Sequence, residues 1–407
     1  MPSNYKRIGD YIKEVKVKNV NLEATLLLGI NIDKFFMPSV ANVIGTDMSN
    51  YRIVKKNQFA CNRMHVGRDY RIPVALSNKE EPFMVSPAYD VFEIKDTTVL
   101  LPEYLMMWFS RKEFDRNAWF YTDADVRGGL HWKAFCDMQL PIPSIEKQKE
   151  IVKEYHILVD RIALNNQLIS KLEETAQAIY KQWFVDFEFP DVNGKAYKSN
   201  GGEMEFCGEL DSEIPKGWSV NLINKYIKLS QGLAMNASNK HLVVEKGIPL
   251  LRITDLINRT EEIFISEKVE KNVIAVKEDI IVSRTGQVGL VFRNKTGVVY
   301  NNCFKVNPFS NLNKEVLYWF LKTKKMYSIM NELASGSSAQ LDLTHKQFYT
   351  LKFLLPTYSL QLKFSEKSIW ISKHLEICEL QVQKLEELKD LLLAKMTRVE
   401  EVKETVN

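Results

Sequence analysis

The sequence lacks the features of a membrane, secreted or metal-binding protein. Among its 407 residues no apolar run approaches the roughly 20 needed to cross a bilayer, and residues 1–10 contain no signal-peptide core. The five cysteines are odd in number, widely spaced and without a Cys-x-x-Cys pair, so neither a disulfide framework nor a zinc site is predicted. We therefore expect a folded cytoplasmic protein with reduced thiols and no membrane contact.

The motifs of DNA-modifying enzymes are missing as well. No Asn-Pro-Pro-Tyr or Asp-Pro-Pro-Tyr methyltransferase motif is present, and the nearest string, residues 86–89 (Ser-Pro-Ala-Tyr), lacks the first residue and the second proline. There is no Gly-x-x-x-x-Gly-Lys-Ser/Thr phosphate loop, and the six histidines form no pair at metal-ligand spacing. The sequence thus predicts neither catalysis nor a metal site.

What the chain does contain is a long internal repeat. Residues 130–174 return as residues 343–387, shifted by 213 positions, and the run 171–174 (Lys-Leu-Glu-Glu) returns unchanged. Upstream the match is looser, and Asn62-Arg63 aligns with Ser283-Arg284. Solenoid repeats are roughly 20 to 50 residues long. A much longer period therefore predicts two tandem copies of one large unit.

The best-repeated part has the pattern of a helix pair. Apolar residues follow a 4-3 spacing from residue 151, and the same spacing begins again at residue 364. Neither stretch contains proline or glycine, so each can form a helix of about 40 residues, roughly 60 Å long. We expect the helices to pair, the alternative being two amphipathic helices packed separately on their own domains. The expected seam consists of Ile151, Tyr155, Leu158, Ile162, Ile169, Leu172, Ile179, Phe364, Ile371, Leu375, Val382, Leu385 and Leu392.

Charge divides the chain further. The net charge is +2 over residues 1–143 and +9 over residues 215–356, whereas residues 186–214 carry −6. An excess of basic residues is typical of polyanion binding. In chain order we expect a first globular domain at 1–143, a spacer helix at 144–185, an exposed acidic connector at 186–214, a second globular domain at 215–356, a second spacer helix at 357–398 and a tail at 399–407.

Several motifs in this arrangement carry a resemblance to a known family. They are residues 214–218 (Ile-Pro-Lys-Gly-Trp), residues 182–187 (Gln-Trp-Phe-Val-Asp-Phe), Pro143 followed by Gln148, and residues 279–289. Together they resemble the specificity subunit of type I restriction-modification systems over essentially the whole chain. The first copy departs from the pattern, since it lacks the Gly-Trp opening. The resemblance implies an α+β fold, with two tandem α/β target recognition domains separated by two long antiparallel coiled-coil helices in pseudo-two-fold symmetry.

The resemblance also implies a function. Each globular copy would read one half of a bipartite target in double-stranded DNA, and the chain would bind no cofactor. The helices would space the half-sites and dock two methyltransferase subunits that bring S-adenosylmethionine; restriction subunits using ATP and Mg would complete the complex. Two other classes stay open, a coiled-coil scaffold that binds only protein and a self-contained DNA-modifying enzyme.

Two kinds of segment are candidates for DNA contact. Base reading needs Arg or Lys toward guanine and Asn or Gln toward adenine, which the turn at 283–287 offers; a simple turn with a solvated arginine is the alternative. In the first copy residues 63–68 form the equivalent cluster, unless an arginine there makes a structural salt bridge. The polar segments before each helix could hold phosphates or preserve the fold. The expected contacts are Arg63, His65, Arg68, Arg127, His131, Lys133, Arg252, Arg284, Thr285, Gln287, Ser337, Gln340, His345 and Lys346.

Overall fold

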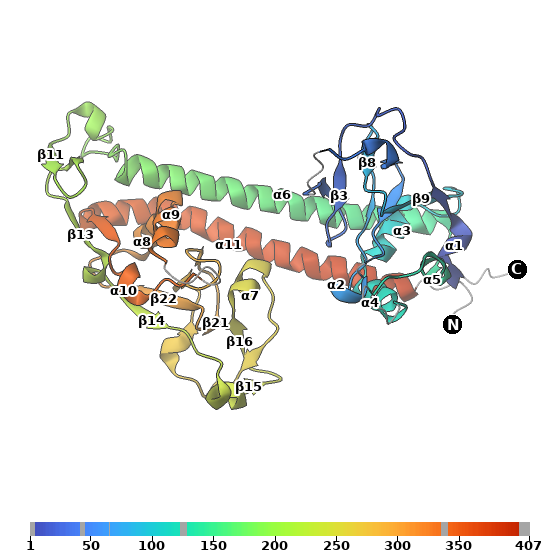
Figure 1. Ribbon diagram of the computed structural model, residues 1–407. Coiled ribbons are helices and arrows are strands. Elements are labelled where there is room, and N and C mark those ends of the chain that lie inside the picture. Colours follow the sequence, from blue (N-terminus) through green and yellow to red (C-terminus); the bar gives the residue numbers. More distant parts are fainter. Residues whose placement is uncertain (1–4, 41–44, 65, 123–127, 335–340, 399–407) are drawn as a thin grey trace, which may run out of the picture. The chain divides into compact units, whose positions relative to one another are not determined.

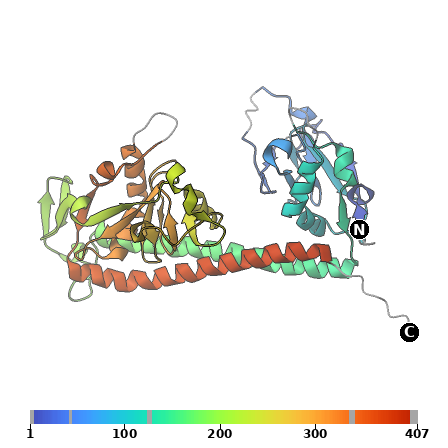
Figure 2. The same cartoon turned by 90° about the horizontal axis from the view of Figure 1, so that it is seen from below.

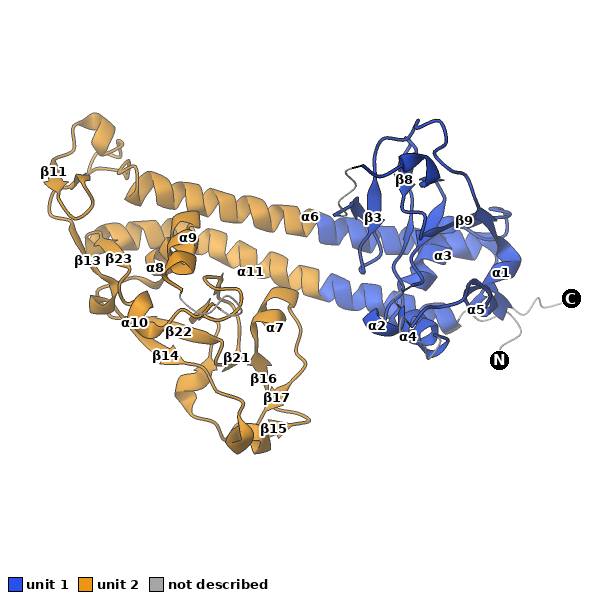
Figure 3. Ribbon diagram, viewed as in Figure 1, with its two compact units in different colours: residues 1–163, 384–407 blue, residues 164–383 orange. Residues whose placement is uncertain are grey.

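The chain folds into two compact units (Figures 1 and 3). A computed structural model describes residues 5–40, 45–64, 66–122, 128–334 and 341–398. The first unit comprises residues 1–163 and 384–407, and the second comprises residues 164–383. Each unit therefore holds one globular module and part of both long helices. No helix in the described ranges is long and apolar enough to span a membrane.

The two expected long helices are confirmed. They are α6 (Ile145–Phe184) and α11 (Tyr358–Lys395), of 40 and 38 residues. Within each unit their segments run side by side and antiparallel (Figures 1 and 2). In the second unit the ring centroids of Trp183, near the end of α6, and Phe364, near the start of α11, are 5.9 Å apart. In the first unit Ile151, near the start of α6, shares a core with Leu393 and Met396, at and beyond the end of α11.

The predicted seam residues are all buried or half-buried. Asn165, a polar residue between Ile162 and Ile169 of the first seam, is only 8% exposed. The seam side chains that are buried are Ile151, Phe364, Ile371, Leu375 and Val382, and those that are half-buried are Tyr155, Leu158, Ile162, Ile169, Leu172, Ile179, Leu385 and Leu392.

The module of the first unit is built on an antiparallel four-stranded sheet. Its strands lie in the order β2 (Ile12–Val15), β9 (Asp90–Ile94), β6 (Phe59–Cys61) and β7 (Val74–Leu76). Phe59 and Phe92 stack across the sheet at 5.0 Å and form part of the main core. The other elements are the pairs β1 (Tyr5–Arg7) with β10 (Gln139–Pro141), β3 (Leu28–Ile30) with β4 (Phe36–Pro38) and β5 (Arg52–Val54) with β8 (Phe83–Val85), and the helices α1 (Ile8–Tyr11), α2 (Val66–Asp69), α3 (Pro102–Phe109), α4 (Lys112–Phe120), α5 (Trp132–Asp137), η1 (Met48–Asn50) and η6 (Met396–Arg398).

The module of the second unit repeats this sheet and adds another. Its four-stranded sheet has the order β14 (Ile227–Gln231), β22 (Cys303–Pro308), β19 (Ile280–Ser283) and β20 (Val291–Phe292). A five-stranded sheet has the order β15 (Val243–Val244), β17 (Phe264–Ile265), β16 (Ile248–Leu251), β21 (Gly297–Val299) and β18 (Ile274–Ala275). The remaining elements are the pairs β11 (Met204–Cys207) with β12 (Ser212–Pro215) and β13 (Ser219–Leu222) with β23 (Lys352–Leu355), the helices α7 (Ile253–Asn258), α8 (Lys314–Leu321), α9 (Lys324–Leu333) and α10 (His345–Phe348), and the short turns η2 (Lys198–Asn200), η3 (Ile223–Lys225), η4 (Ala237–Leu242) and η5 (Lys271–Val273).

The duplication seen in the sequence is therefore present in the topology. If the four strands of each sheet are numbered in sequence order, their order across the sheet is 1-4-2-3 in both modules. In each module a further strand pair, β1 with β10 or β13 with β23, joins the start of the module to the strand before the long helix. The mixed α/β character expected for both modules is confirmed.

A buried glutamine holds the start of each long helix against its module. Gln148 Oε1 accepts from the Leu101 backbone N–H at 2.9 Å, while its Nε2 donates to the Pro143 carbonyl at 2.9 Å. Gln361 does the same in the second unit, where its Oε1 accepts from the Asn313 N–H at 2.8 Å and its Nε2 donates to the Pro356 carbonyl at 3.0 Å. The repeated glutamine thus fixes how the polypeptide enters the helix.

The acidic connector is less exposed than its composition predicts. Helix α6 ends at Phe184, and Phe187 and Phe189 of the connector are both only 8% exposed. Phe189 stacks on Trp218 at 5.5 Å, and Phe187 meets the same ring edge-on at 5.7 Å. In the sequence Phe187 and Phe189 alternate with Asp186 and Glu188, and the acidic residues favoured the prediction of an exposed segment. The connector is consequently anchored in the core of the second unit.

Candidate nucleic-acid interface

Arg284 follows strand β19, and its guanidinium is committed to other protein groups. Its Nε and Nη2 donate to the two Asp342 carboxylate oxygens at 2.9 and 2.7 Å, and its Nη1 donates to Gln231 Oε1 at 3.0 Å. The Arg284 carbonyl accepts from the Leu343 N–H at 2.9 Å. Arg284 thus ties the sheet to the lead-in segment, residues 343–356, that precedes α11.

Arg63 occupies the matching position in the first module. Its Nε donates to Asp90 at 2.6 Å, and its Nη1 donates to the Leu130 carbonyl. The Leu130 N–H returns a bond to the Arg63 carbonyl at 2.9 Å, and the guanidinium lies 5.5 Å from the centroid of the Trp132 ring. Both arginines therefore attach a sheet to the segment that precedes the long helix. For Arg63 this is the structural salt bridge left open from the sequence, whereas Arg284 is neither free nor solvated as its alternative assumed.

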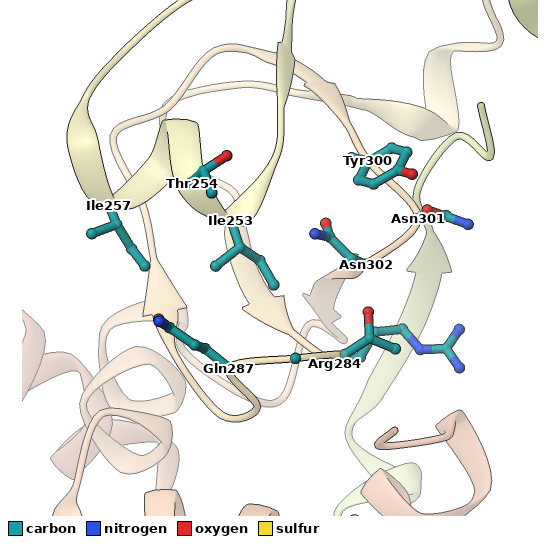
Figure 4. A pocket seen from close by; sticks show the side chains of 10 residues that line it. Ile253, Thr254, Ile257, Arg284, Gln287, Tyr300, Asn301 and Asn302 are labelled. Carbon is teal, nitrogen blue, oxygen red and sulfur yellow. The ribbon is translucent and has the colours of Figure 1, made fainter. Parts of the chain in front are cut away.

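Beside Arg284 lies a hollow of about 560 Å³ in the second module (Figure 4). The turn after β19, helix α7 and the residues before β22 surround it. In Figure 4 the Arg284 guanidinium points away from α7, whereas the Asn302 amide points toward Ile253 of that helix. The lining residues are Ile253, Thr254, Ile257, Arg284, Thr285, Gly286, Gln287, Tyr300, Asn301 and Asn302.

The polar groups of this hollow are mostly uncharged side chains. Gln287 is exposed, and no side-chain hydrogen bond ties its amide to the described part of the chain. The Asn302 Oδ1 is buried without a hydrogen-bond partner among the described residues. The Asn302 carbonyl, in contrast, accepts from the Arg284 N–H at 2.8 Å. The hollow therefore offers amides to a ligand while its single arginine stays engaged.

The turn that carries Gln287 is held in place by the buried Ser283 side chain. The buried Ser283 hydroxyl donates to the Gln287 carbonyl at 2.5 Å and accepts from the Leu290 N–H at 2.9 Å. Gly286 adopts a φ of +76°, a left-handed conformation that glycine takes without strain. The Gln287 side chain consequently projects from a backbone of fixed geometry.

His345 and Lys346, in the lead-in segment of the second module, differ in accessibility. The His345 ring meets Phe304 edge-on at 5.3 Å, and its Nε2 is buried without a partner in the described structure. Burial, with a smaller contribution from Arg284, lowers the pKa of His345 below its ordinary 6.5, which keeps the ring neutral at neutral pH. Lys346 is exposed on α10. Lys346 can therefore meet a phosphate, and His345 is poorly placed to do so.

Two basic residues expected in the first module, Lys133 and Arg68, are exposed and paired with acids. Lys133 forms an ion pair with Asp137 at 2.7 Å, and its side chain is 86% exposed. Arg68 pairs with Asp69 at 2.7 Å, and hydrogen bonding to that carboxylate raises the pKa of Arg68. His131 is also exposed. Such surface pairs contribute little to stability, so Lys133 and Arg68 can exchange their partners for phosphates.

Four expected residues and one arginine complete the set. His65, Arg127, Ser337 and Gln340 lie outside the described residues. Arg252 precedes α7 and pairs with Asp255 at 2.6 Å and with Glu262 at 2.5 Å, and these hydrogen bonds raise its pKa. The structure brings Arg284, Thr285 and Gln287 together and adds residues that the sequence did not single out, namely Thr254, Tyr300, Asn301 and Asn302.

Comparison with known proteins finds a matching family model and similar curated proteins. Residues 215–389 match the family model described as the type I restriction modification DNA specificity domain. The specificity subunit of the HindI type I restriction enzyme from Haemophilus influenzae is 24% identical, over 89% of this chain and 91% of the relative. Over most of its length the chain is therefore similar to specificity subunits of type I restriction-modification systems.

Two further specificity subunits are similar to this chain. That of the MjaIX type I restriction enzyme from Methanocaldococcus jannaschii is 26% identical over 63% of this chain, although the match spans only 52% of the relative. The crystal structure of the type I specificity subunit from M. genitalium aligns with a TM-score of 0.53 and 14% identity, covering 96% of this chain and 95% of that one. At this identity the alignment supports the fold alone.

Proposed function

We propose that this specificity subunit reads a bipartite DNA target, one half with each α/β module. The observation that carries the proposal is the contrast between what the modules share and what they do not. They share the strand order, the arginine bound to the lead-in segment and the buried glutamine. The turn after β19, however, is Arg-Thr-Gly-Gln in the second module, and residues 63–66 are Arg-Met-His-Val in the first. Side chains that differ on a shared framework are what two different half-sites require.

The long helices would space the half-sites and dock partner subunits. Helix α11 exposes several large apolar side chains, among them Trp370 at 59%, Ile377 at 50% and Leu391 at 58%. Exposed apolar side chains recurring along one helix are typical of a protein–protein interface. We assign this surface to two methyltransferase subunits, which would bring S-adenosylmethionine. Restriction subunits that use ATP and Mg would join the same complex.

Phosphate contacts would anchor each module on the duplex. Lys133 and Lys346 are exposed at positions related by the 213-residue shift, on α5 and α10. A basic residue repeated in two modules that read different sequences suits a contact that carries no sequence information. The salt dependence of DNA binding would report these contacts, because each neutralised phosphate releases counterions.

Mapping methylated adenines in host DNA with and without this chain tests the proposal. A gapped motif that appears only when the chain is present is the expected result. The same motif in cells lacking the gene, or chain-dependent methylation without a gapped motif, would contradict it. Filter binding to random duplexes across a salt series separates a protein scaffold from a DNA reader, since a scaffold would show no retention even at low salt.

A further inference from the structure

The hollow beside Arg284 has the chemistry of a base-reading site for adenine. We infer that Gln287 and Asn302 read an A·T base pair of the half-site recognised by the second module. The inference rests on the proposed function and deepens it, because it names the base and the side chains that read it.

The charge state of the hollow disfavours guanine. Guanine is read in the major groove through its N7 and O6 acceptors, most often by an arginine or lysine that donates to both. Arg284 is the one basic side chain among the lining residues, and Asp342 and Gln231 already occupy its donors. Releasing it would leave the partly buried Asp342 without its partner. Recognition in the hollow therefore falls to the neutral polar side chains.

The amide side chains match adenine instead. Adenine presents an N7 acceptor and an N6 amino donor in the major groove, which one carboxamide can satisfy with its own donor and acceptor. Gln287 has both groups unoccupied within the described structure, and its turn is held rigid by Ser283. A rigid backbone lowers the entropy lost when the side chain binds.

Asn302 gives the independent sign of a ligand. Its Oδ1 is buried and has no hydrogen-bond partner in the described part of the chain, while the residue lines the hollow. A buried acceptor without a donor is costly, and native proteins keep few of them. An amino donor entering the hollow would satisfy this oxygen. The one N6–H of adenine that base pairing leaves free is such a donor, and Gln287 then donates from its Nε2 to N7 of the same adenine.

Apolar groups in the same hollow suit the partner base. Thymine carries a methyl group at the major-groove edge, which proteins recognise by apolar contact. Ile257 is 44% exposed on α7, and Thr254 is exposed one helical turn earlier. An A·T pair would thus find amides for its purine and a methyl-bearing surface for its pyrimidine.

The test uses the assembled methylation complex and single-molecule mapping of its methylated motif. Gln287→Ala should relax the motif at one A·T position in one half and lower discrimination there about ten- to a hundredfold. Asn302→Ala should relax the same or the adjacent position. The other half should stay unchanged. Asn224→Ala, which alters an exposed asparagine of the same module outside the hollow, should leave the motif intact.

The outcomes separate the inference from the proposed function. A wild-type complex without a chain-dependent gapped motif overturns both. A normal motif that Gln287→Ala leaves unchanged, or relaxes at a G·C pair, overturns only the adenine site. Gln287→Glu supplies a further check that does not depend on folding of the Asn302 variant. The residue is exposed, and a carboxylate should shift preference from adenine toward the amino donor of cytosine.

Discussion

Replacing Gln361 with methionine should selectively destabilise the second unit. Gln361 is 1% exposed and bonds three backbone groups, the Asn313 N–H at 2.8 Å and the carbonyls of Pro356 at 3.0 Å and Asn311 at 3.3 Å. Methionine has a similar length and helix propensity but can replace none of these bonds. All three backbone groups would lose their partner.

The size of the effect follows from those three groups. Each buried polar group left unsatisfied costs about 1 to 3 kcal/mol, and the longest bond, to Asn311, should count least. Taking the lower end of this range for each group, we expect a loss of about 3 kcal/mol. For a unit of this size each kcal/mol lowers the melting temperature by about 2 to 4 °C, so the shift should be roughly 6 to 12 °C.

Thermal melting combined with hydrogen exchange measures this change in the full-length chain. Exchange at the Asn313 amide should accelerate, because it loses its acceptor, whereas peptides of the first unit should exchange as before. Gln381→Met is the matched control, since Gln381 is exposed on the same helix. Equal melting temperatures for the two variants, with equal protection of the Asn313 amide, would refute the reasoning.

Three further substitutions separate framework, titration and docking. Lysine at position 284 cannot keep both hydrogen bonds to the Asp342 carboxylate. Arg284→Lys should therefore lower the free energy of unfolding of the second unit, measured in urea, by about 1.5 to 3 kcal/mol and leave the methylated motif unchanged. A changed base in the motif would contradict the structural role of Arg284. The folded state holds the pKa of His345 below 6.5, so the unfolded chain binds the proton first and the free energy of unfolding should fall as the pH drops through about 6.5. Between about pH 7.5 and 5.5 the His345→Gln variant should lose less of its free energy of unfolding than the wild type. Equal losses in the two proteins would contradict the role of His345. Trp370→Glu should weaken capture of methyltransferase subunits at least about tenfold with unchanged melting, and undiminished capture would place the docking surface elsewhere.

The long helices could be predicted from the sequence because their signal is local and periodic. A 4-3 spacing without proline or glycine specifies both the helix and the face it buries, and the structure contains α6 and α11 within a few residues of the expected bounds. The buried phenylalanines of the connector were not predicted, because a net charge of −6 over residues 186–214 is typical of an exposed segment and only two separated aromatics indicated otherwise.

The candidate site was predictable only in part. The turn around Arg284 was found through its residue types, but the acid that binds Arg284 lies 58 positions away, and sequence spacing says nothing about such a partner. Asn302 could not be predicted, because nothing in a single asparagine before a buried strand indicates that its Oδ1 has no partner among the described residues. Polar groups whose role depends on tertiary contacts are thus invisible to pattern and composition.

The core shared by Ile151, Leu393 and Met396 has a consequence for biosynthesis. The first module is translated early, yet part of the apolar surface that completes its unit is supplied by the last turns of α11. On the ribosome this unit cannot complete its core until the end of α11 has emerged. The second unit, whose residues 164–383 are continuous, can finish folding first. The order of synthesis and the order of completion are thereby reversed.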